Sequence, residues 1–160
     1  MLERLIEELD LEPIPDEGGW FRRVFTGPLM ECGRPRYTSI YALFTREQFS
    51  AFHRLDADEL FLYHGGDPFE LFEFKPDGSV KRIVLGNNVK KGHVPQYVFE
   101  EGNWFGGMPL SNGPLGYSLM SCVVTPGFTY EGFELGNREN LCREYPDCVE
   151  TIHRLTRSTI

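Results

Sequence analysis

Residues 52–74 read FHRLDADELFLYHGGDPFELFEF, and this stretch decides the fold. Apolar and aromatic residues lie on both sides of a short acidic break, Asp56–Asp58, which is typical of a turn. We expect one β-strand to end near Leu55 and a second to begin at Glu59. The stretch therefore predicts two consecutive strands joined by a tight connection.

The side chains of a strand alternate between its two faces, so parity decides which residues share a surface. On the first strand, His53 shares a face with Leu55. On the second, Glu59 shares a face with Phe61 and Tyr63. If these faces line the interior of the protein, His53 and Glu59 converge in a largely aromatic cavity. A few polar groups in an apolar concavity are how small-molecule sites are usually built.

The rest of the chain extends this pattern. From residue 18 to about 128, short apolar runs are separated by turn residues, which indicates a β-sandwich or barrel. Residues 69–85 predict a hairpin around a Pro-Asp-Gly turn. Apolar residues at helical spacing predict a helix over 2–10. Two further helical pieces are expected after Gly136, the first capped by Asn137 and ending at Tyr145, the second opened by Pro146.

Composition sets the broad class. The chain has 160 residues, of which 41% are hydrophobic and 14% aromatic, so we expect one globular domain over 1–160. The barrel should cover about 17–136 and a C-terminal helical tail about 137–157. A net charge of −8 argues against nucleic-acid binding. The charged N-terminus is unlike a signal peptide, no run reaches the length of a membrane span, and the four cysteines lack CxxC spacing, which predicts reduced thiols in the cytoplasm.

Two motifs point to a known superfamily. The spacing of His53, Leu55, Glu59 and Gly66 resembles the first cupin motif, in which a second histidine stands where this chain has Leu55. The second cupin motif is matched only in outline, with Phe105 in the place of its histidine. Two of the four usual cupin metal ligands are therefore present.

Six ordered segments are similar to the uncharacterised cupin 5 family. They are Glu17–Arg22, Ser39–Tyr41, His53 with Asp58–Glu59, His64–Pro68, Glu101–Trp104, and Thr125–Phe128 with Gly132–Leu135. The resemblance implies a mainly β fold, the cupin double-stranded β-helix or jelly-roll barrel, with short helices at both ends. It also implies a relationship in fold to the dTDP-4-dehydrorhamnose 3,5-epimerases and a homodimer.

The expected pocket combines these motifs with strand parity. Ser39 and Tyr41 share a face and should point at a ligand, and Glu17 and Arg22 should form the rim. The glycines after Glu17 make either a plain turn or a close approach of the backbone to a ligand. The aromatic residues suit a planar ring such as a nucleobase. The remaining expected ligand-binding residues are Asp58, Phe61, Gln96 and Trp104.

Three functions are consistent with this pocket. An isomerase- or epimerase-like enzyme would act on a nucleotide-sugar-like or other carbonyl substrate, with His53 as base, Asp58 or Glu59 orienting it, and Tyr63 or Tyr41 returning a proton. A cupin that only binds or senses a small ligand is the first alternative. The second is a metal-dependent enzyme.

No cofactor is favoured, because a catalytic metal usually needs three protein ligands. His53 and Glu59 supply two. His64 would supply a third divalent-metal ligand only if a bulge near Gly65–Gly66 turned it inward, since parity places it on the opposite face.

Overall fold

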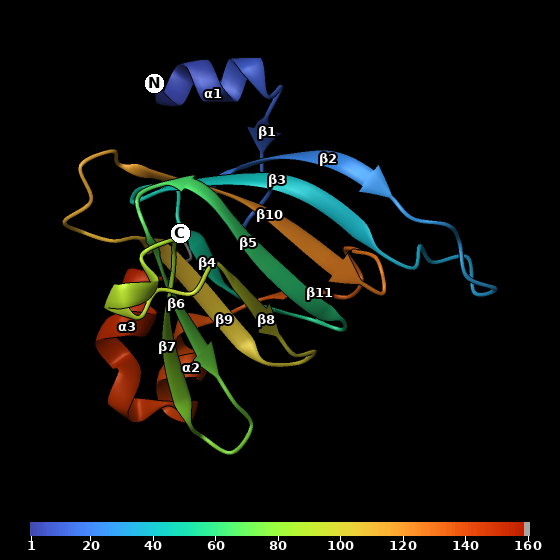
Figure 1. Cartoon of the computed structure of the whole chain (residues 1–160). Coiled ribbons are helices and arrows are strands. Elements are labelled where there is room, and N and C mark those ends of the chain that lie inside the picture. The colour runs from blue at the N-terminus through green and yellow to red at the C-terminus, as the bar shows by residue number, and fades with distance from the viewer. Residues whose placement is uncertain (159–160) are drawn as a thin grey trace.

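Two antiparallel β-sheets face each other in the computed structural model, which describes residues 1–158 (Figure 1). The six-stranded sheet has the order β1-β2-β3-β10-β5-β8, and the five-stranded sheet has the order β11-β4-β9-β6-β7. The predicted mainly β jelly-roll architecture is confirmed. The strands are β1 (Glu12–Pro13), β2 (Trp20–Thr26), β3 (Thr38–Thr45), β4 (Ser50–Leu55), β5 (Asp58–Gly66), β6 (Phe69–Phe74), β7 (Val80–Leu85), β8 (Gln96–Phe99), β9 (Trp104–Pro109), β10 (Tyr117–Thr125) and β11 (Phe133–Leu135).

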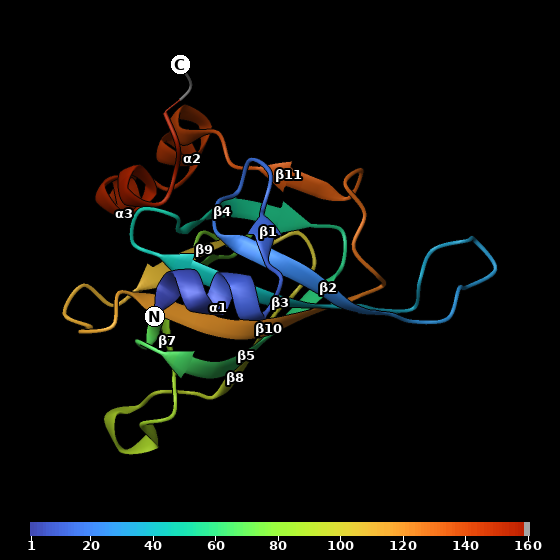
Figure 2. The ribbon, with the colours of Figure 1, turned by 90° about the horizontal axis from the view of Figure 1, so that it is seen from above.

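The α-helices lie at the two ends of the chain, as expected. Helix α1 (Leu2–Glu8) lies on the outer side of the six-stranded sheet (Figure 2). Asn137 caps α2 (Arg138–Glu144) by accepting a hydrogen bond from the backbone N–H of Asn140, and a proline opens the 3₁₀ turn η2 (Pro146–Cys148). The remaining helices are η1 (Val89–Lys91) and α3 (Val149–Arg154). Within residues 1–158, no helix is both long and apolar enough to cross a membrane.

The chain crosses from one sheet to the other between β4 and β5. Strand β4 ends at Leu55 as predicted, and β5 begins at Asp58, one residue earlier than predicted, because Asp58 pairs with Thr125 of β10. The connection is only two residues long, so consecutive strands lie in opposite walls of the barrel. His53 and Glu59 are therefore close in sequence, yet they reach into the interior from opposite sheets.

Apolar side chains fill one end of the space between the sheets. This packed end is rich in phenylalanine and continues as far as Cys122, whose side chain also borders the hollow at the other end. Its larger members are Phe44, Phe61, Phe69, Leu71, Leu85, Phe99, Phe105 and Met120. Close packing at one end leaves the space around His53 as the open end of the barrel.

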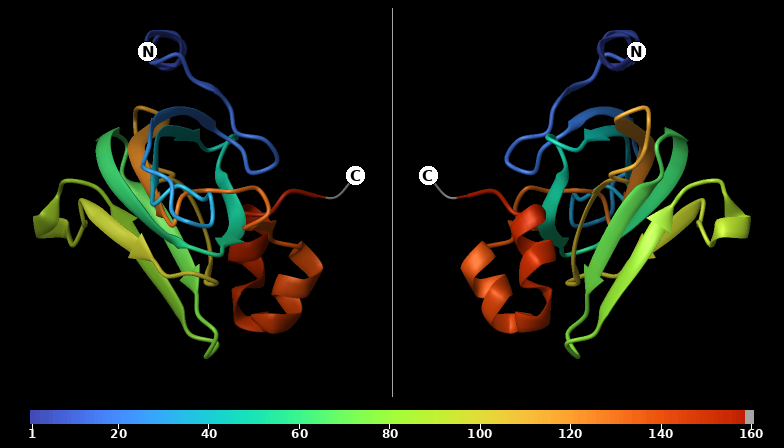
Figure 3. Two further views of the ribbon diagram at one scale, coloured as in Figure 1. Left: turned by 90° about the vertical axis from the view of Figure 1, so that its right-hand side faces the viewer. Right: turned by 90° about the vertical axis from the view of Figure 1, so that its left-hand side faces the viewer.

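A second core lies outside the barrel. The C-terminal helices pack against the outer face of the five-stranded sheet, as the side views show (Figure 3). Leu141 of α2 and Ile152 of α3 are fully buried there against Phe52, Phe74 and Trp104. The tail is thus an integral layer of the protein and covers the back of the strand that carries His53.

Truncating this second core should destabilise the protein. Replacing Leu141 by Ala removes buried contacts and leaves a cavity, so we expect the free energy of unfolding to fall by about 2–5 kcal/mol in urea titrations. Leu115 is 55% exposed in a loop and serves as the matched control. Leu115→Ala should change the stability by less than about 0.5 kcal/mol. Equal effects of the two substitutions would contradict the proposed role of the tail.

Candidate functional site

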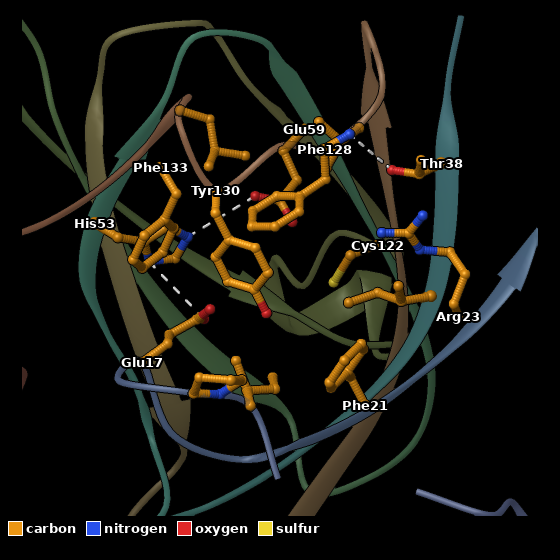
Figure 4. Close-up of a pocket in the computed structure, with 15 residues that line it drawn as sticks. Glu17, Phe21, Arg23, Thr38, His53, Glu59, Cys122, Phe128, Tyr130 and Phe133 are labelled. Atoms are coloured by element: carbon orange, nitrogen blue, oxygen red, sulfur yellow. Dashed lines mark hydrogen bonds and ion pairs between the residues drawn. The ribbon is translucent and has the colours of Figure 1, made fainter. Parts of the chain in front are cut away.

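A cavity of about 190 Å³ occupies the open end of the barrel (Figure 4). Its walls come from both sheets and from two connecting loops. The acidic and imidazole side chains of Glu17, His53 and Glu59 lie together on one side of the cavity, and Arg23 lies across from them (Figure 4). Further lining residues are Thr38, Leu55, Cys122, Phe128, Tyr130 and Phe133.

Two carboxylates flank the imidazole of His53, one at each ring nitrogen. Nδ1 lies 3.8 Å from Oε1 of Glu17, and Nε2 lies 3.9 Å from Oε2 of Glu59. Nδ1 also lies 2.7 Å from the carbonyl oxygen of Ala51. Because a carbonyl can only accept, Nδ1 must carry a proton, which leaves Nε2 as the nitrogen that gains or loses one. Nε2 is the nitrogen that faces Glu59.

His53 holds its extra proton at neutral pH. The residue is 2% exposed, and burial by itself lowers the pKa of its imidazole. The negative charges of Glu17 and then Glu59 outweigh that effect and raise the pKa of His53 from 6.5 to about 9. The resting residue is therefore an imidazolium.

Glu59 presents a carboxylate oxygen without a hydrogen-bond partner. The residue is 7% exposed, and its Oε2 is buried without a hydrogen bond to any described residue. Burial raises the pKa of Glu59, although the charge of His53 opposes that shift. Glu17 differs, because its Oε1 accepts a hydrogen bond of 2.6 Å from the hydroxyl of Ser50. Of the two carboxylates, Glu59 is the one left free to accept a hydrogen bond or a proton from a ligand.

Aromatic rings enclose the imidazole. The centre of the Phe105 ring lies 4.3 Å from the centre of the His53 ring. The Phe133 ring stacks on the His53 ring, with 5.5 Å between their centres. Phe128 and Tyr130, from the loop between β10 and β11, extend this wall towards the mouth. Phe105 occupies the position of a cupin histidine, so an apolar surface that excludes water stands where a metal ligand is usual.

A family model described as "Cupin superfamily (DUF985)", cupin 5, matches residues 3–136. The chain belongs to the cupin superfamily. A solved hypothetical protein from Leishmania major is 34% identical to this cupin with a TM-score of 0.87, and one from Shewanella oneidensis is 32% identical with a TM-score of 0.90. Each alignment covers 98% of both chains. No curated protein matches the chain.

Oxalate decarboxylase from Bacillus subtilis shares the fold of this cupin at much lower similarity. It is 14% identical with a TM-score of 0.58, and the alignment covers 91% of this chain and 37% of the decarboxylase. A Klebsiella pneumoniae protein with a double-stranded β-helix domain is 17% identical with a TM-score of 0.51, over 82% of this chain and 94% of that protein. At such identities the likeness concerns architecture alone.

Strand β3 presents to the pocket the face opposite to the one that the sequence analysis predicted. Ser39 and Tyr41 do share a face, but Thr38 and Ile40 are the residues that line the pocket. The same error affects β2, where Arg23 lines the pocket and Arg22 instead donates a hydrogen bond to the carbonyl of Leu9. Parity identifies residues that share a face without saying which face is inside. The expected pocket roles of Ser39, Tyr41 and Arg22 are therefore corrected.

Glu17, His53 and Glu59 line the pocket as predicted, and the other predicted residues lie outside it. Phe61 fills the packed end of the barrel, and the Tyr63 hydroxyl donates to the carbonyl of Gly66. Asp58 and Gln96 are exposed, and Trp104 lies beneath the C-terminal helices. These positions correct the expected catalytic role of Tyr63 and the expected ligand contacts of the others.

Three of the pocket residues that the sequence patterns missed come from the loop before β11 and the start of that strand. Phe128 and Phe133 belong to segments that carried the cupin 5 resemblance, and Tyr130 lies between them. Cys122 lies on an inward position of β10, and burial raises the pKa of its thiol well above 9, which keeps it protonated. All four cysteines are free. The resemblance was a signal for the loop, but nothing in the strand pattern indicated that it closes over a cavity.

The donor set of this cupin does not fit a three-ligand metal centre. His64 stands at an irregularity in the pairing of β5 with β10, as suggested, but its Nε2 lies 2.6 Å from the hydroxyl of Ser121 and the residue is exposed. Glu17 lies at the ring nitrogen that already donates to a backbone carbonyl. Across residues 1–158, no three histidine, cysteine or acidic side chains group as metal ligands would.

The buried imidazolium should make stability depend on pH. The folded protein binds the His53 proton more tightly than the unfolded chain does, because its pKa is raised from 6.5 to about 9. The resulting stabilisation, about 3 kcal/mol at most, is present below pH 6.5 and is lost as the pH rises through 9. We expect urea unfolding between pH 6 and 10 to show this loss in the wild type and a smaller one in His53→Gln. Parallel curves for the two proteins would contradict the assignment.

Proposed function

We propose that this cupin binds a small carbonyl compound in the pocket and transfers a proton at the carbon next to the carbonyl, as isomerases and epimerases do. One observation carries the proposal: a buried, unpartnered oxygen of Glu59 lies 3.9 Å from the proton-bearing Nε2 of His53. A hydrogen-bond donor beside a free carboxylate is the pair of groups that enolisation requires.

In the proposed reaction, the substrate carbonyl accepts a hydrogen bond from the Nε2–H of His53. Oε2 of Glu59 removes the proton from the adjacent carbon. The electron pair of that C–H bond forms a C=C bond, the π electron pair of the carbonyl moves onto its oxygen, and the imidazolium stabilises the enolate that forms. The roles differ from those expected from the sequence, because His53 holds its proton in the resting state and Glu59 is the group with a free lone pair.

Tyr130 is the hydroxyl that we assign to return the proton. It lines the cavity from the loop before β11 (Figure 4). Donation from its hydroxyl to carbon would complete the exchange. Because Tyr130 is 62% exposed, solvent can restore its proton. Once the product leaves, Glu59 releases the proton that it removed to water entering the pocket, which completes the cycle. A carbon that loses its proton to one group and regains it from another, on the opposite face, inverts its configuration.

The dimensions and charges of the pocket narrow the substrate. Its volume of about 190 Å³ is below the range of roughly 300–1,000 Å³ typical of sites for drug-sized ligands. A single sugar or short keto acid would fill it, and any nucleotide would extend beyond the mouth. Arg23 lies at the cavity wall and donates only to the hydroxyl of Thr26 among residues 1–158. We therefore propose a carbonyl substrate with an acidic group that pairs with Arg23.

Hydrogen exchange tests the proton transfer even when the product is unidentified. Keto and aldehyde sugar phosphates, keto acids and sugar nucleotides are incubated with the protein in D₂O, and deuterium at carbon is measured by NMR. At least one compound should exchange, and Glu59→Gln should slow that exchange by about 100-fold or more. His53→Gln should slow it as well, because the enolate loses its stabilising charge.

Two exposed residues of the C-terminal helix α3 provide matched controls for these variants. Glu150→Gln and His153→Gln make the same changes of side chain away from the pocket and should exchange at the wild-type rate. If no compound exchanges faster with the wild type than with Glu59→Gln, the proposed reaction is wrong.

Arg23 and Arg22 test the acidic group, because they are neighbours on opposite faces of β2. Arg23→Gln should weaken binding of an exchanging anionic substrate by about tenfold or more, consistent with about 1.5–3 kcal/mol for a hydrogen bond to a charged group. Arg22→Gln should bind with wild-type affinity. Isothermal titration calorimetry measures both constants. A larger effect at Arg22 would contradict the assignment of Arg23.

A cupin that binds a ligand without chemistry is the second candidate. The replacement of two usual metal-ligand histidines by Leu55 and Phe105 favours it, since both residues leave an apolar wall suited to binding alone. Tight calorimetric binding of a compound that shows no exchange would support this candidate. The homodimer, the nucleotide-like ligand and the cytoplasmic location stay predictions from the sequence.

A further inference from the structure

The C-terminal tail contacts the loop that carries Glu17 through one side chain, Arg157. Nε and Nη2 of Arg157 lie 3.2 and 3.1 Å from the carbonyl oxygen of Glu17 and donate to it. Nη2 also donates to the carbonyl of Phe49 at 3.2 Å, and the guanidinium lies 4.3 Å from the centre of the Phe49 ring. The Arg157 guanidinium thus joins two segments. One is the loop that carries Glu17, and the other is Phe49, which directly precedes the strand β4 that carries His53.

The loop after Glu17 needs such an external tie. Gly18 and Gly19 have φ angles of +111° and +82°, in the region that favours glycine. Two consecutive glycines give a loop many alternative conformations, so its native form must be held by contacts. A Cβ atom at Gly18 would collide with the guanidinium of Arg157. The glycine therefore makes room for the arginine, which is the group that approaches this backbone.

The tail is itself held in register beside His53. Strand β4 is irregular where it pairs with β9, between Ser50 and His53, and the backbone N–H of Phe52 there donates to the carbonyl of Leu155 at 2.8 Å. Arg138 of α2 donates to the carbonyl of Thr156 at 2.6 Å and to its hydroxyl at 2.7 Å. Leu155 and Thr156, the two residues that precede Arg157, are thus held by hydrogen bonds. The position of the Arg157 backbone is therefore fixed by the fold.

We propose that Arg157 is a positioning residue: by holding the backbone of Glu17, it keeps the Glu17 carboxylate beside His53 and so sets the charge of the buried imidazole. This role concerns the same pocket as the proposed function. Its test measures the pKa of His53 in the absence of any substrate. Failure of this inference and failure of the proposed proton transfer are therefore separate results.

Few groups besides Glu17 can alter the ionisation of His53. Phe105 from β9 and Phe133 from β11 pack against the imidazole and do not titrate. The titratable or charged groups that face it across the cavity are Glu59 from β5, Cys122 from β10, Arg23 from β2 and Tyr130 from the loop before β11. None of these contacts the guanidinium of Arg157 within residues 1–158, so a change at Arg157 acts on His53 through Glu17 or through its own charge.

These two routes have opposite signs. Removing the positive charge of Arg157 would by itself raise the pKa of His53, because a nearby cation disfavours the imidazolium. Releasing the Glu17 carboxylate would lower the pKa of His53, because the largest favourable charge on it is lost. The direction of the shift therefore distinguishes positioning from simple electrostatics.

The test is an NMR titration of the His53 ring in the full-length protein. The chain has four histidines, and His53→Gln assigns the signal. We expect Arg157→Met to lower the pKa of His53 by about one unit, in the range that a neighbouring charge produces. In a Glu17→Gln background, Arg157→Met should no longer lower the pKa of His53. Arg154→Met, which removes another arginine of the same tail, should leave the pKa of His53 unchanged.

A charge-conserving variant guards against a general loss of stability. Arg157→Lys keeps the cation but not the two-nitrogen contact with the Glu17 carbonyl. It should lower the pKa of His53 by less than Arg157→Met does, with thermal unfolding still cooperative. An unchanged or raised pKa in both variants would overturn the proposal. So would a shift from Arg157→Met that persists in full after Glu17 is replaced by Gln.

Discussion

A charged imidazole in a protein interior needs opposite charge within a few ångströms, because the energy of removing it from water is large. In this cupin the need is met on both sides of His53, by Glu17 and Glu59. The two carboxylates come from parts of the chain that share little else: a glycine loop before β2 and the start of β5. The arrangement of the open end of the barrel follows from bringing these three groups together.

The apolar interior of the barrel strengthens the interactions among these three charged groups. Phenylalanine side chains close one end, and further rings surround the imidazole at the other, so the charges interact through a medium of low polarity. Two positions that hold histidines in metal-binding cupins carry Leu55 and Phe105 here. The same substitutions that remove metal donors strengthen the coupling between His53 and Glu59. A pocket built in this way suits the movement of a proton better than the coordination of an ion.

The helical tail contributes to this site from outside the barrel. Its apolar residues bury the back of β4, and its last described turn supplies a backbone partner for Phe52 and a guanidinium for the Glu17 loop. Stability and site geometry are therefore linked in one segment. The tail follows residues 3–136, the part matched by the family model. A segment outside the recognised family region thus helps to hold a pocket residue that lies within it.

The amino-acid sequence by itself determined the strands, the turn at Asp56–Asp58, both terminal helices and the pairing of His53 with Glu59. Those features depend on local periodicity, turn chemistry and motif spacing, and each of these signals is contained in a short segment of the sequence. Only the tertiary structure decided that Thr38 and Arg23 face the cavity while Ser39 and Arg22 do not. Periodicity reveals which residues share a face, whereas the inner face depends on how the two sheets close. Tyr130 and Arg157 were missed for a related reason: the paths of a loop and of the tail across the fold bring Tyr130 to the pocket and Arg157 to the backbone of Glu17.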